Sequence, residues 1–161
     1  MTQNKPDRIL VIRLSSIGDI LLSIPLIIEL NNKFPDCKID YLVAQKFNKV
    51  LTPLYPYLGQ IHHFNKDRKE SSEIKRVRRN IRNNDYDWIL DIHNSLRTRR
   101  LLFPIHNKIY RINKYEIRRF LFVKLGWEIY PEIPVHQKYL NTAPVDLPTT
   151  QSWYIEDCAQ Q

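Results

Sequence analysis

Short aliphatic runs alternate with amphipathic stretches through most of this chain. Residues 8–13 read Arg-Ile-Leu-Val-Ile-Arg, a branched aliphatic run typical of a parallel strand covered on both faces. Residues 17–34 then carry apolar side chains at helical spacing and end at Phe34-Pro35, which predicts a single helix. Residues 38–43 alternate and predict a second strand, followed by a short amphipathic helix over 45–54 that prolines close.

The same alternation of strand and helix continues toward residue 125. The helix expected over 70–84 is polar and basic, with Ile74, Val77 and Ile81 on an inward stripe. Repeated strand-then-helix order with short connections predicts an α/β fold, namely a Rossmann-like, doubly wound parallel sheet. The remaining expected elements are strands over 60–64, 86–92 and 108–112 and helices over 95–103 and 114–125.

The end of the chain differs in composition from the rest. Four prolines follow Tyr130, and only residues 135–142 have a pattern that predicts a helix. We therefore expect one Rossmann-like domain over residues 1–143 and a linker or truncated tail over residues 144–161.

Length and composition fit a single globular domain. The chain has 161 residues, of which 43% are hydrophobic and 26% charged. The two cysteines, Cys37 and Cys158, lie far apart and predict neither a disulfide framework nor a zinc site. The His62-His63 pair has no carboxylate or cysteine at metal-ligand spacing. No apolar run approaches the roughly 20 residues that span a bilayer, so we expect a cytoplasmic protein without a metal site.

The charge of the chain is concentrated in one segment. The formal net charge is +8, and residues 66–119 contain 16 Lys or Arg against 7 Asp or Glu. A basic surface of this kind attracts polyanions such as nucleic acid, anionic lipid or a phosphorylated glycolipid. Any one of these residues could equally belong to a solvated helix surface.

The first strand-to-helix loop, Arg13-Leu-Ser-Ser-Ile-Gly-Asp19, is the best candidate for a site. Ligands of open parallel sheets bind at the carboxyl ends of strands, and we expect Gly18 to let the backbone turn tightly into the helix. Asp19 would lie in the first helical turn, where Ser15 or Ser16 can cap the free amides. The alternative is that Asp19 only stabilises the start of the helix and has no part in chemistry. The loop has neither glycine-rich phosphate motif, so a nucleotide is not expected there.

Several separate blocks of this sequence resemble glycosyltransferase family 9, the ADP-heptose:lipopolysaccharide heptosyltransferases. The first block is Arg13-Leu-Ser-Ser-Ile-Gly-Asp-Ile20, followed by Ser23-Ile-Pro25 and by residues 34–43. The segment Tyr86-Asp-Trp-Ile-Leu-Asp-Ile-His-Asn-Ser-Leu-Arg97 and residues 135–140 also match. The resemblance covers roughly residues 8–145.

This resemblance implies the first of two Rossmann-like domains in a GT-B glycosyltransferase, the domain that binds the acceptor. The nucleotide-sugar, ADP-heptose in that family, would be held by a C-terminal domain absent from this sequence, and no cofactor is implied. Asp19 would be the general base of an inverting transfer, with Ser15, Ser16 and Gly18 shaping the loop around it. A single domain would transfer no sugar alone, because it cannot hold both substrates in reacting geometry.

The acceptor in that family is an acidic lipopolysaccharide core glycolipid, which would give the basic surface a purpose. Arg97, Arg99 and Arg100 follow the fourth predicted strand at the carboxyl edge of the sheet, so we expect them to bind the acceptor. The resemblance adds Arg118, Arg119 and His136. Any of these six residues could equally contribute only surface charge. The loop His93-Asn94-Ser95 departs from many relatives, which carry a glutamine and a glycine there. We also expect peripheral contact with the anionic inner face of the membrane.

Two other functions compete with this interpretation. The cluster Lys75-Arg76-Val-Arg78-Arg79-Asn-Ile-Arg82, near Tyr86 and Trp88, could belong to a nucleic-acid-binding module, although no helix-turn-helix, RRM or KH pattern is visible. Alternatively, the chain could be a non-catalytic remnant, because the donor-binding half is lacking.

Overall fold

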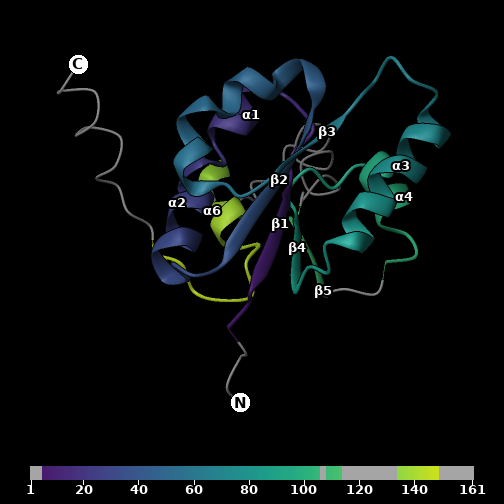
Figure 1. Cartoon of the computed structure of the whole chain (residues 1–161). Coiled ribbons are helices and arrows are strands. Elements are labelled where there is room, and N and C mark those ends of the chain that lie inside the picture. Colours follow the sequence, from purple (N-terminus) through teal and green to yellow (C-terminus); the bar gives the residue numbers. More distant parts are fainter. Residues whose placement is uncertain (1–4, 106–107, 114–133, 149–161) are drawn as a thin grey trace, which may run out of the picture.

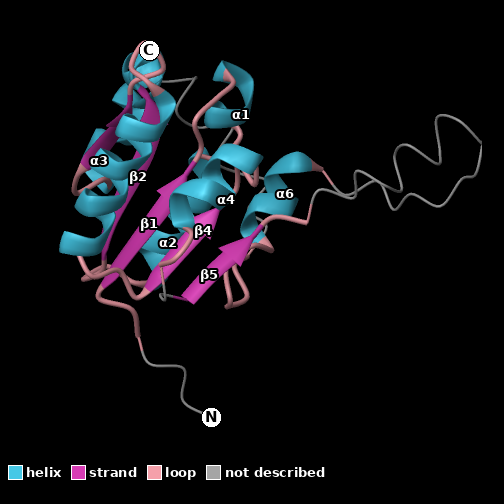
Figure 2. Cartoon of the chain, turned by 90° about the vertical axis from the view of Figure 1, so that its right-hand side faces the viewer, coloured by secondary structure: helices cyan, strands magenta, loops and turns pink. Residues whose placement is uncertain are grey.

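A computed structural model describes residues 5–105, 108–113 and 134–148 and contains one five-stranded parallel sheet. The strand order is β3-β2-β1-β4-β5, with β1 at the centre (Figures 1 and 2). Ile9 of β1 pairs with Ile39 of β2 on one side and with Trp88 of β4 on the other. The strands are β1 (Arg8–Ile12), β2 (Lys38–Ala44), β3 (Ile61–Phe64), β4 (Trp88–Asp91) and β5 (Lys108–Arg111).

Helices cover both faces of this sheet, which confirms the predicted α/β, Rossmann-like fold (Figure 1). One apolar core lies under α1 (Ile17–Leu21), α2 (Ile24–Lys33), the 3₁₀ helix η1 (Gln45–Tyr57) and α6 (Val135–Leu140). The other lies under α3 (Glu70–Asn83) and α4 (Leu96–Leu102). Val11 faces the first core, whereas Leu10 and Ile12 face the second, as expected for a central strand buried on both sides.

The single helix predicted over 17–34 is wrong, because the structure has two helices there. Ser23 is the N-cap of α2 and Pro25 lies in its first turn. Proline carries no backbone N–H and its ring clashes with the preceding turn, so a helix cannot continue through it undisturbed. The Ser23 hydroxyl donates to the carbonyl of Ile20 at 2.6 Å, which closes α1 at this junction. Apolar spacing continues through the break, which hid it from the sequence pattern.

The segment after β2 forms a 3₁₀ helix instead of the predicted amphipathic α-helix. Pro53 and Pro56 lie inside η1 and remove two of the amide donors that a regular α-helix needs. Leu51 and Leu54 are buried, so the segment is amphipathic, as predicted. The helix predicted over 114–125 falls outside the described residues.

Buried residues continue past residue 143, the predicted end of the domain. Leu147 is 8% exposed and belongs to the core under α2, and Val145 packs against the same core. The side chain of Lys33 also donates to the carbonyl of Asp146 at 2.6 Å. Residues up to 147 therefore contribute to this domain.

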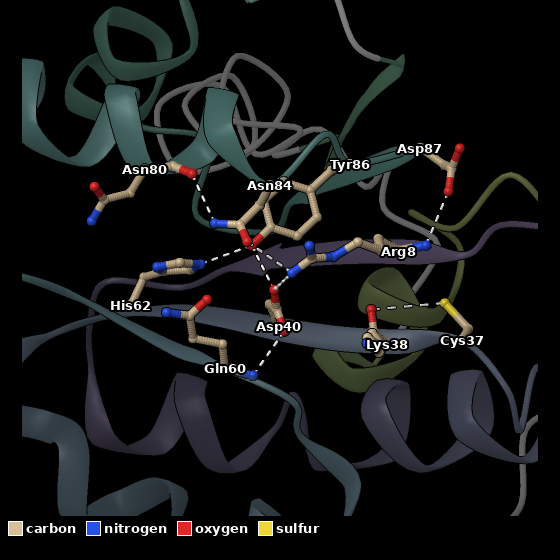
Figure 3. Close-up of polar contacts among 10 residues, drawn as sticks. All are labelled: Arg8, Cys37, Lys38, Asp40, Gln60, His62, Asn80, Asn84, Tyr86 and Asp87. Carbon is tan, nitrogen blue, oxygen red and sulfur yellow. Dashed lines mark hydrogen bonds and ion pairs between the residues drawn. The ribbon is translucent and has the colours of Figure 1, made fainter.

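A buried polar cluster lies beneath α3 (Figure 3). Asp40 is 1% exposed, and its Oδ2 accepts from Arg8 at 2.9 Å and from the Tyr86 hydroxyl at 2.6 Å. Its Oδ1 accepts from the backbone N–H of Gln60 at 2.7 Å. His62 Nε2 lies 2.7 Å from the Tyr86 hydroxyl. The cluster joins β1, β2, β3 and the segment just before β4, and so helps to fix how these strands pack together.

Candidate active site at the carboxyl edge of the sheet

The loop between β1 and α1 places a carboxylate at the carboxyl edge of the sheet. Asp19 lies in the first turn of α1, and Ser16 is the N-cap residue. Asp19 Oδ2 accepts from the Ser16 backbone N–H at 3.1 Å and from the Ser16 hydroxyl at 2.9 Å. The predicted placement of Asp19 in the first helical turn is therefore confirmed. The Ser16 hydroxyl does not cap a helix amide as expected; this hydroxyl and the Ser16 backbone N–H both donate to the same carboxylate oxygen.

Arg13 holds the same carboxylate from the end of β1. Its guanidinium forms an ion pair with Asp19 Oδ2, and Nη1 donates to the carbonyl of Ile92 at 2.7 Å. The side chain of Arg13 is 11% exposed, whereas that of Asp19 is 34% exposed. The cation is thus fixed in the protein while the carboxylate it pairs with remains accessible to solvent.

Tyr139 of α6 reaches the other carboxylate oxygen. Its hydroxyl donates to Asp19 Oδ1 at 3.4 Å, and the Arg13 guanidinium lies 5.6 Å from the centre of its ring. Burial is the main cause that raises the pKa of Tyr139 to about 12. Tyr139 therefore remains a protonated hydroxyl donor at neutral pH.

The surroundings of Asp19 keep it ionised. Partial burial acts to raise its pKa, but the hydrogen bonds from Ser16 and the charge of Arg13 outweigh that effect and lower the pKa below its ordinary value. A carboxylate that is charged, partly exposed and held at one oxygen can accept a proton at the other.

Gly18 does not perform the tight turn expected of it. It lies inside α1, and a Cβ atom placed on it would meet nothing within 4 Å. The helix therefore does not require glycine at this position. Because glycine has no side chain, the space beside Asp19 is open. Ser15, the remaining predicted loop residue, is partly exposed just before the N-cap.

A second loop, between β4 and α4, positions the arginines. Asp91 at the end of β4 is fully buried, and its Oδ1 accepts from the Asn94 backbone N–H at 2.8 Å. Asn94 adopts a left-handed conformation with φ 41°, which asparagine tolerates better than most residues. Ser95 then caps α4, because its hydroxyl accepts from the Thr98 N–H at 3.2 Å. Burial raises the pKa of Asp91 despite the hydrogen bond from Asn94.

The three predicted arginines of α4 differ in their surroundings. Arg97 pairs with Glu70 at 3.0 Å and lies 5.7 Å from the centre of the Phe64 ring. Arg99 donates to Asn94 Oδ1 at 3.0 Å, and Arg100 is 3.7 Å from Glu70 with a side chain 73% exposed. Arg97 therefore faces β3 and the site edge, whereas Arg100 faces solvent.

A small cleft adds two cations that sequence reasoning missed. It encloses about 230 Å³ at the carboxyl ends of β2 and β3 and is lined by Ala44, Gln45, Lys46, Phe64, Asn65, Lys66 and Asp67. Burial, together with the nearby charges of Arg97 and Lys46, lowers the pKa of Lys66. These three cations thus repel one another. The two lysines of the lining outnumber its one carboxylate, Asp67, so the cleft has a net positive charge that favours an anion.

The other predicted site residues lie outside these two loops or outside the residues that the structure describes. His136 lies in α6, one turn before Tyr139, and is partly exposed. Arg118 and Arg119 fall outside the described residues. Among residues 5–105, 108–113 and 134–148, no group of three or more His, Cys, Asp or Glu side chains gathers that could hold a metal ion. In the same ranges, no helix has the length and apolarity needed to cross a membrane.

Comparison with solved structures finds the same fold in other proteins. A glycosyl transferase family 9 structure from Veillonella parvula matches with a TM-score of 0.58 at 23% identity, over 66% of this chain and 36% of that one. E. coli heptosyltransferase WaaC, solved with ADP-2-deoxy-2-fluoro heptose, matches with a TM-score of 0.69 at 17% identity, over 92% of this chain and 52% of that one.

The fold is that of glycosyltransferase family 9 structures. The chain spans about half of WaaC and about a third of the Veillonella protein. A UDP-N-acetylglucosamine 2-epimerase also matches, with a TM-score of 0.52 at 17% identity, so the same fold serves other sugar nucleotide enzymes. No protein-family model matches the sequence, and no curated protein matches it.

Besides the two cleft lysines, sequence reasoning overlooked Arg13 and Tyr139, which contact Asp19. Arg13 carried a usable signal, because it is a charged residue at the end of an otherwise aliphatic strand. Tyr139 carried none, since its contact with Asp19 joins positions 120 residues apart.

Proposed function

We propose that this chain is the acceptor-binding half of an inverting, heptosyltransferase-like glycosyltransferase. The observation that carries the proposal is the Asp19 carboxylate at the carboxyl edge of the sheet. Its Oδ2 is held by Ser16 and Arg13, while Oδ1 accepts only the long hydrogen bond from Tyr139 among the described residues. The Asp19 side chain is 34% exposed. The likeness to family 9 structures supports a glycosyltransferase-like fold.

Asp19 would act as general base in the transfer step. An acceptor hydroxyl approaches over Gly18, where no side chain obstructs it. Its oxygen bonds to the anomeric carbon of the donor while its proton passes to Asp19 Oδ1. The bond from that carbon to the diphosphate oxygen breaks on the opposite face, and the nucleoside diphosphate leaves with the electron pair, which inverts the anomeric centre.

The acceptor would be an acidic glycolipid of the lipopolysaccharide core. The cleft cations Lys46 and Lys66, together with Arg97, lie at the edge that presents Asp19 and suit a carboxylate or phosphate group. Arg99 would add a further contact from the start of α4. The donor, by analogy with the ADP-sugar bound in WaaC, would be ADP-heptose held by a second domain.

The test separates acceptor binding from transfer. Titration calorimetry with a deacylated inner-core oligosaccharide should show that the chain alone binds acceptor, and Lys66→Gln should weaken that binding. Lys38→Gln, which removes an exposed charge at the opposite edge of the sheet, is the matched control. Equal weakening by both variants would contradict a specific acceptor cleft.

Transfer is measured with ADP-heptose after a donor-binding domain is fused to the chain. Asp19→Asn should leave acceptor binding intact and lower turnover by about 10²–10⁴-fold, the range for loss of a general base. Undiminished turnover in Asp19→Asn would refute the assigned base. Acceptor binding without turnover in any fused protein would instead favour the non-catalytic remnant.

A further inference from the structure

Two helices on one face of the sheet expose an unusual combination of side chains. Within α3 and α4 there are eight Lys or Arg and only two acidic residues, both Glu. One of these, Glu73, is fully buried and paired with Arg76, and the other, Glu70, pairs with Arg97 and Arg100. The outward surface of the two helices therefore has a strong excess of positive charge.

The cations of α3 form a regular outward stripe. Ile74, Val77 and Ile81 are buried against the sheet, which turns Lys75, Arg79 and Arg82 toward solvent. These three lie at spacings of four and three residues, so they line one side of the helix over two turns. All three are exposed.

On α4 the outward side combines cations with apolar side chains. Leu96 is 76% exposed and Phe103, just past the helix end, is 75% exposed, the two most exposed large apolar side chains among the described residues. They flank Arg100 at spacings of four and three residues, and Arg99 is exposed beside it. Exposing two large apolar side chains to water is unfavourable, which suggests that a partner covers them.

The two stripes belong to one surface. α3 and α4 lie side by side over the same core (Figure 1), and Arg78 of α3 donates to the carbonyl of Leu101 in α4 at 3.0 Å. Because the inward sides of both helices pack on the sheet, their exposed stripes face away from it together. The cationic surface consists of Lys75, Arg79, Arg82, Leu96, Arg99, Arg100 and Phe103.

We propose that this cationic surface docks on an anionic lipid bilayer, with Leu96 and Phe103 entering the interfacial region. Lysine and arginine near a membrane are attracted by anionic headgroups, and inserted leucine and phenylalanine add binding that salt does not screen. Leu96 directly precedes Arg97, so docking would bring the site edge close to membrane-borne acceptors. The proposal does not depend on catalysis by Asp19.

A nucleic acid is the less suitable polyanion. Single-stranded nucleic acids are held by exposed aromatic side chains on which bases stack. Tyr86 and Trp88, the aromatic residues nearest the basic helix in sequence, are 1% and 4% exposed and belong to the two cores. Phe103 is therefore the one aromatic side chain of the cationic surface, which does not form a platform for successive bases. An exposed leucine also adds nothing to the recognition of a phosphate backbone.

Flotation of the purified chain with vesicles tests the proposal. Binding should be seen with phosphatidylglycerol–phosphatidylcholine vesicles and not with phosphatidylcholine alone. The variant Lys75→Gln/Arg79→Gln/Arg82→Gln should bind about 100-fold more weakly, since each cation near the surface contributes about fivefold. Leu96→Ser/Phe103→Ser should bind about tenfold more weakly and lose the binding that persists at high salt.

Two matched controls keep this test specific. Lys33→Gln/Lys38→Gln/Lys49→Gln removes the same number of exposed charges outside the cationic surface, and Ile17→Ser/Leu21→Ser removes exposed apolar residues from α1. Both should bind vesicles like the unmodified chain. The proposal is overturned if either control weakens binding as strongly, if Leu96→Ser/Phe103→Ser changes nothing, or if the chain binds an oligonucleotide but not anionic vesicles.

Discussion

The Tyr139 hydroxyl lies 3.4 Å from Asp19 Oδ1, although the two residues are separated by 120 positions in the chain. Arg13 completes the arrangement, because its guanidinium pairs with Asp19 and lies over the Tyr139 ring. Helix α6 is thereby tied to the loop that carries the candidate base. Three elements, β1, α1 and α6, set the position of one carboxylate.

Removal of the Tyr139 hydroxyl tests this contact between α6 and Asp19. Tyr139→Phe keeps the buried ring and deletes one long hydrogen bond, so the free energy of unfolding should fall by no more than about 0.5–1.5 kcal/mol. In the fused enzyme, turnover should fall while acceptor affinity is retained, because the direction of Asp19 Oδ1 is no longer fixed. Urea unfolding and steady-state kinetics measure the two effects. Unchanged kinetics would show that the contact is only structural.

Arg13→Met tests the electrostatic part of the arrangement. Loss of the guanidinium charge should raise the pKa of Asp19, because that charge helps to keep the carboxylate ionised. The native contribution of Asp19 to stability is present above the pKa of an unfolded aspartate and is lost as pH falls through its lowered folded pKa, so the variant should lose part of it. Carboxyl ¹³C NMR titration gives the pKa directly.

Arg99→Met is the control for that measurement. Arg99 lies at the same edge of the sheet but donates to Asn94 and not to Asp19. Its removal should leave the titration of Asp19 unchanged. A pKa for Asp19 that is the same in all three proteins would contradict the role given to Arg13.

The elements of the fold were largely predictable, whereas the contacts of the site were not. The run Ile9–Ile12 is aliphatic because β1 is buried on both faces, and this burial is what the sequence pattern records. The break before Pro25 was hidden because α1 and α2 both bury their apolar residues in the same core. Asp19 was predictable from its position after a strand.

The contacts of Asp19 depend on how distant segments pack together. Tyr139 meets Asp19 only because α6 returns to the core near α2, and no local pattern encodes that return. Lys46 and Lys66 follow different strands and share a cleft only because β2 and β3 are paired in parallel. Pairing of this kind is a property of the assembled sheet.

Gly18→Ala separates a structural role of this glycine from a role in access. Alanine fits the helix without steric conflict, because no atom lies within 4 Å of its added Cβ. The free energy of unfolding should therefore rise by about 0.5–1 kcal/mol from helix propensity and chain entropy. In the fused enzyme, the apparent KM for acceptor should increase, because the methyl group narrows the approach to Asp19. A destabilised variant would mean that the backbone needs glycine after all.

Asp40→Ala tests the buried cluster of Figure 3. The substitution would leave Arg8, the Tyr86 hydroxyl and the Gln60 N–H without the acceptor that they share. Breaking a fully buried ion pair on one side costs roughly 3–5 kcal/mol. Because the Arg8 side chain is 30% exposed, chemical denaturation should show a loss at or below the lower end of this range. Asp36→Ala is the matched control, because its ion pair with Lys5 is exposed on both sides. Equal losses in the two variants would contradict a structural role specific to the buried pair.

The same cluster predicts how stability depends on pH. Burial lowers the pKa of His62 below the ordinary histidine value, because a charged imidazolium would be poorly solvated there. In the unfolded chain His62 takes up a proton near pH 6.5, whereas the folded protein resists protonation until a lower pH. The unfolded state therefore binds more protons in this interval, and the free energy of unfolding should decrease as pH falls below about 6.5.

Urea unfolding between pH 7.5 and pH 5.5, followed by circular dichroism, measures this decrease, which one group limits to about 1.4 kcal/mol per pH unit. His62→Gln should flatten the profile, because it removes the titrating group and can still donate to the Tyr86 hydroxyl. His63→Gln should keep the original slope, since His63 is only partly buried and lies 2.8 Å from Asn48 outside the cluster. If the slope persists in His62→Gln, another group must account for the pH dependence and the buried histidine is not its cause.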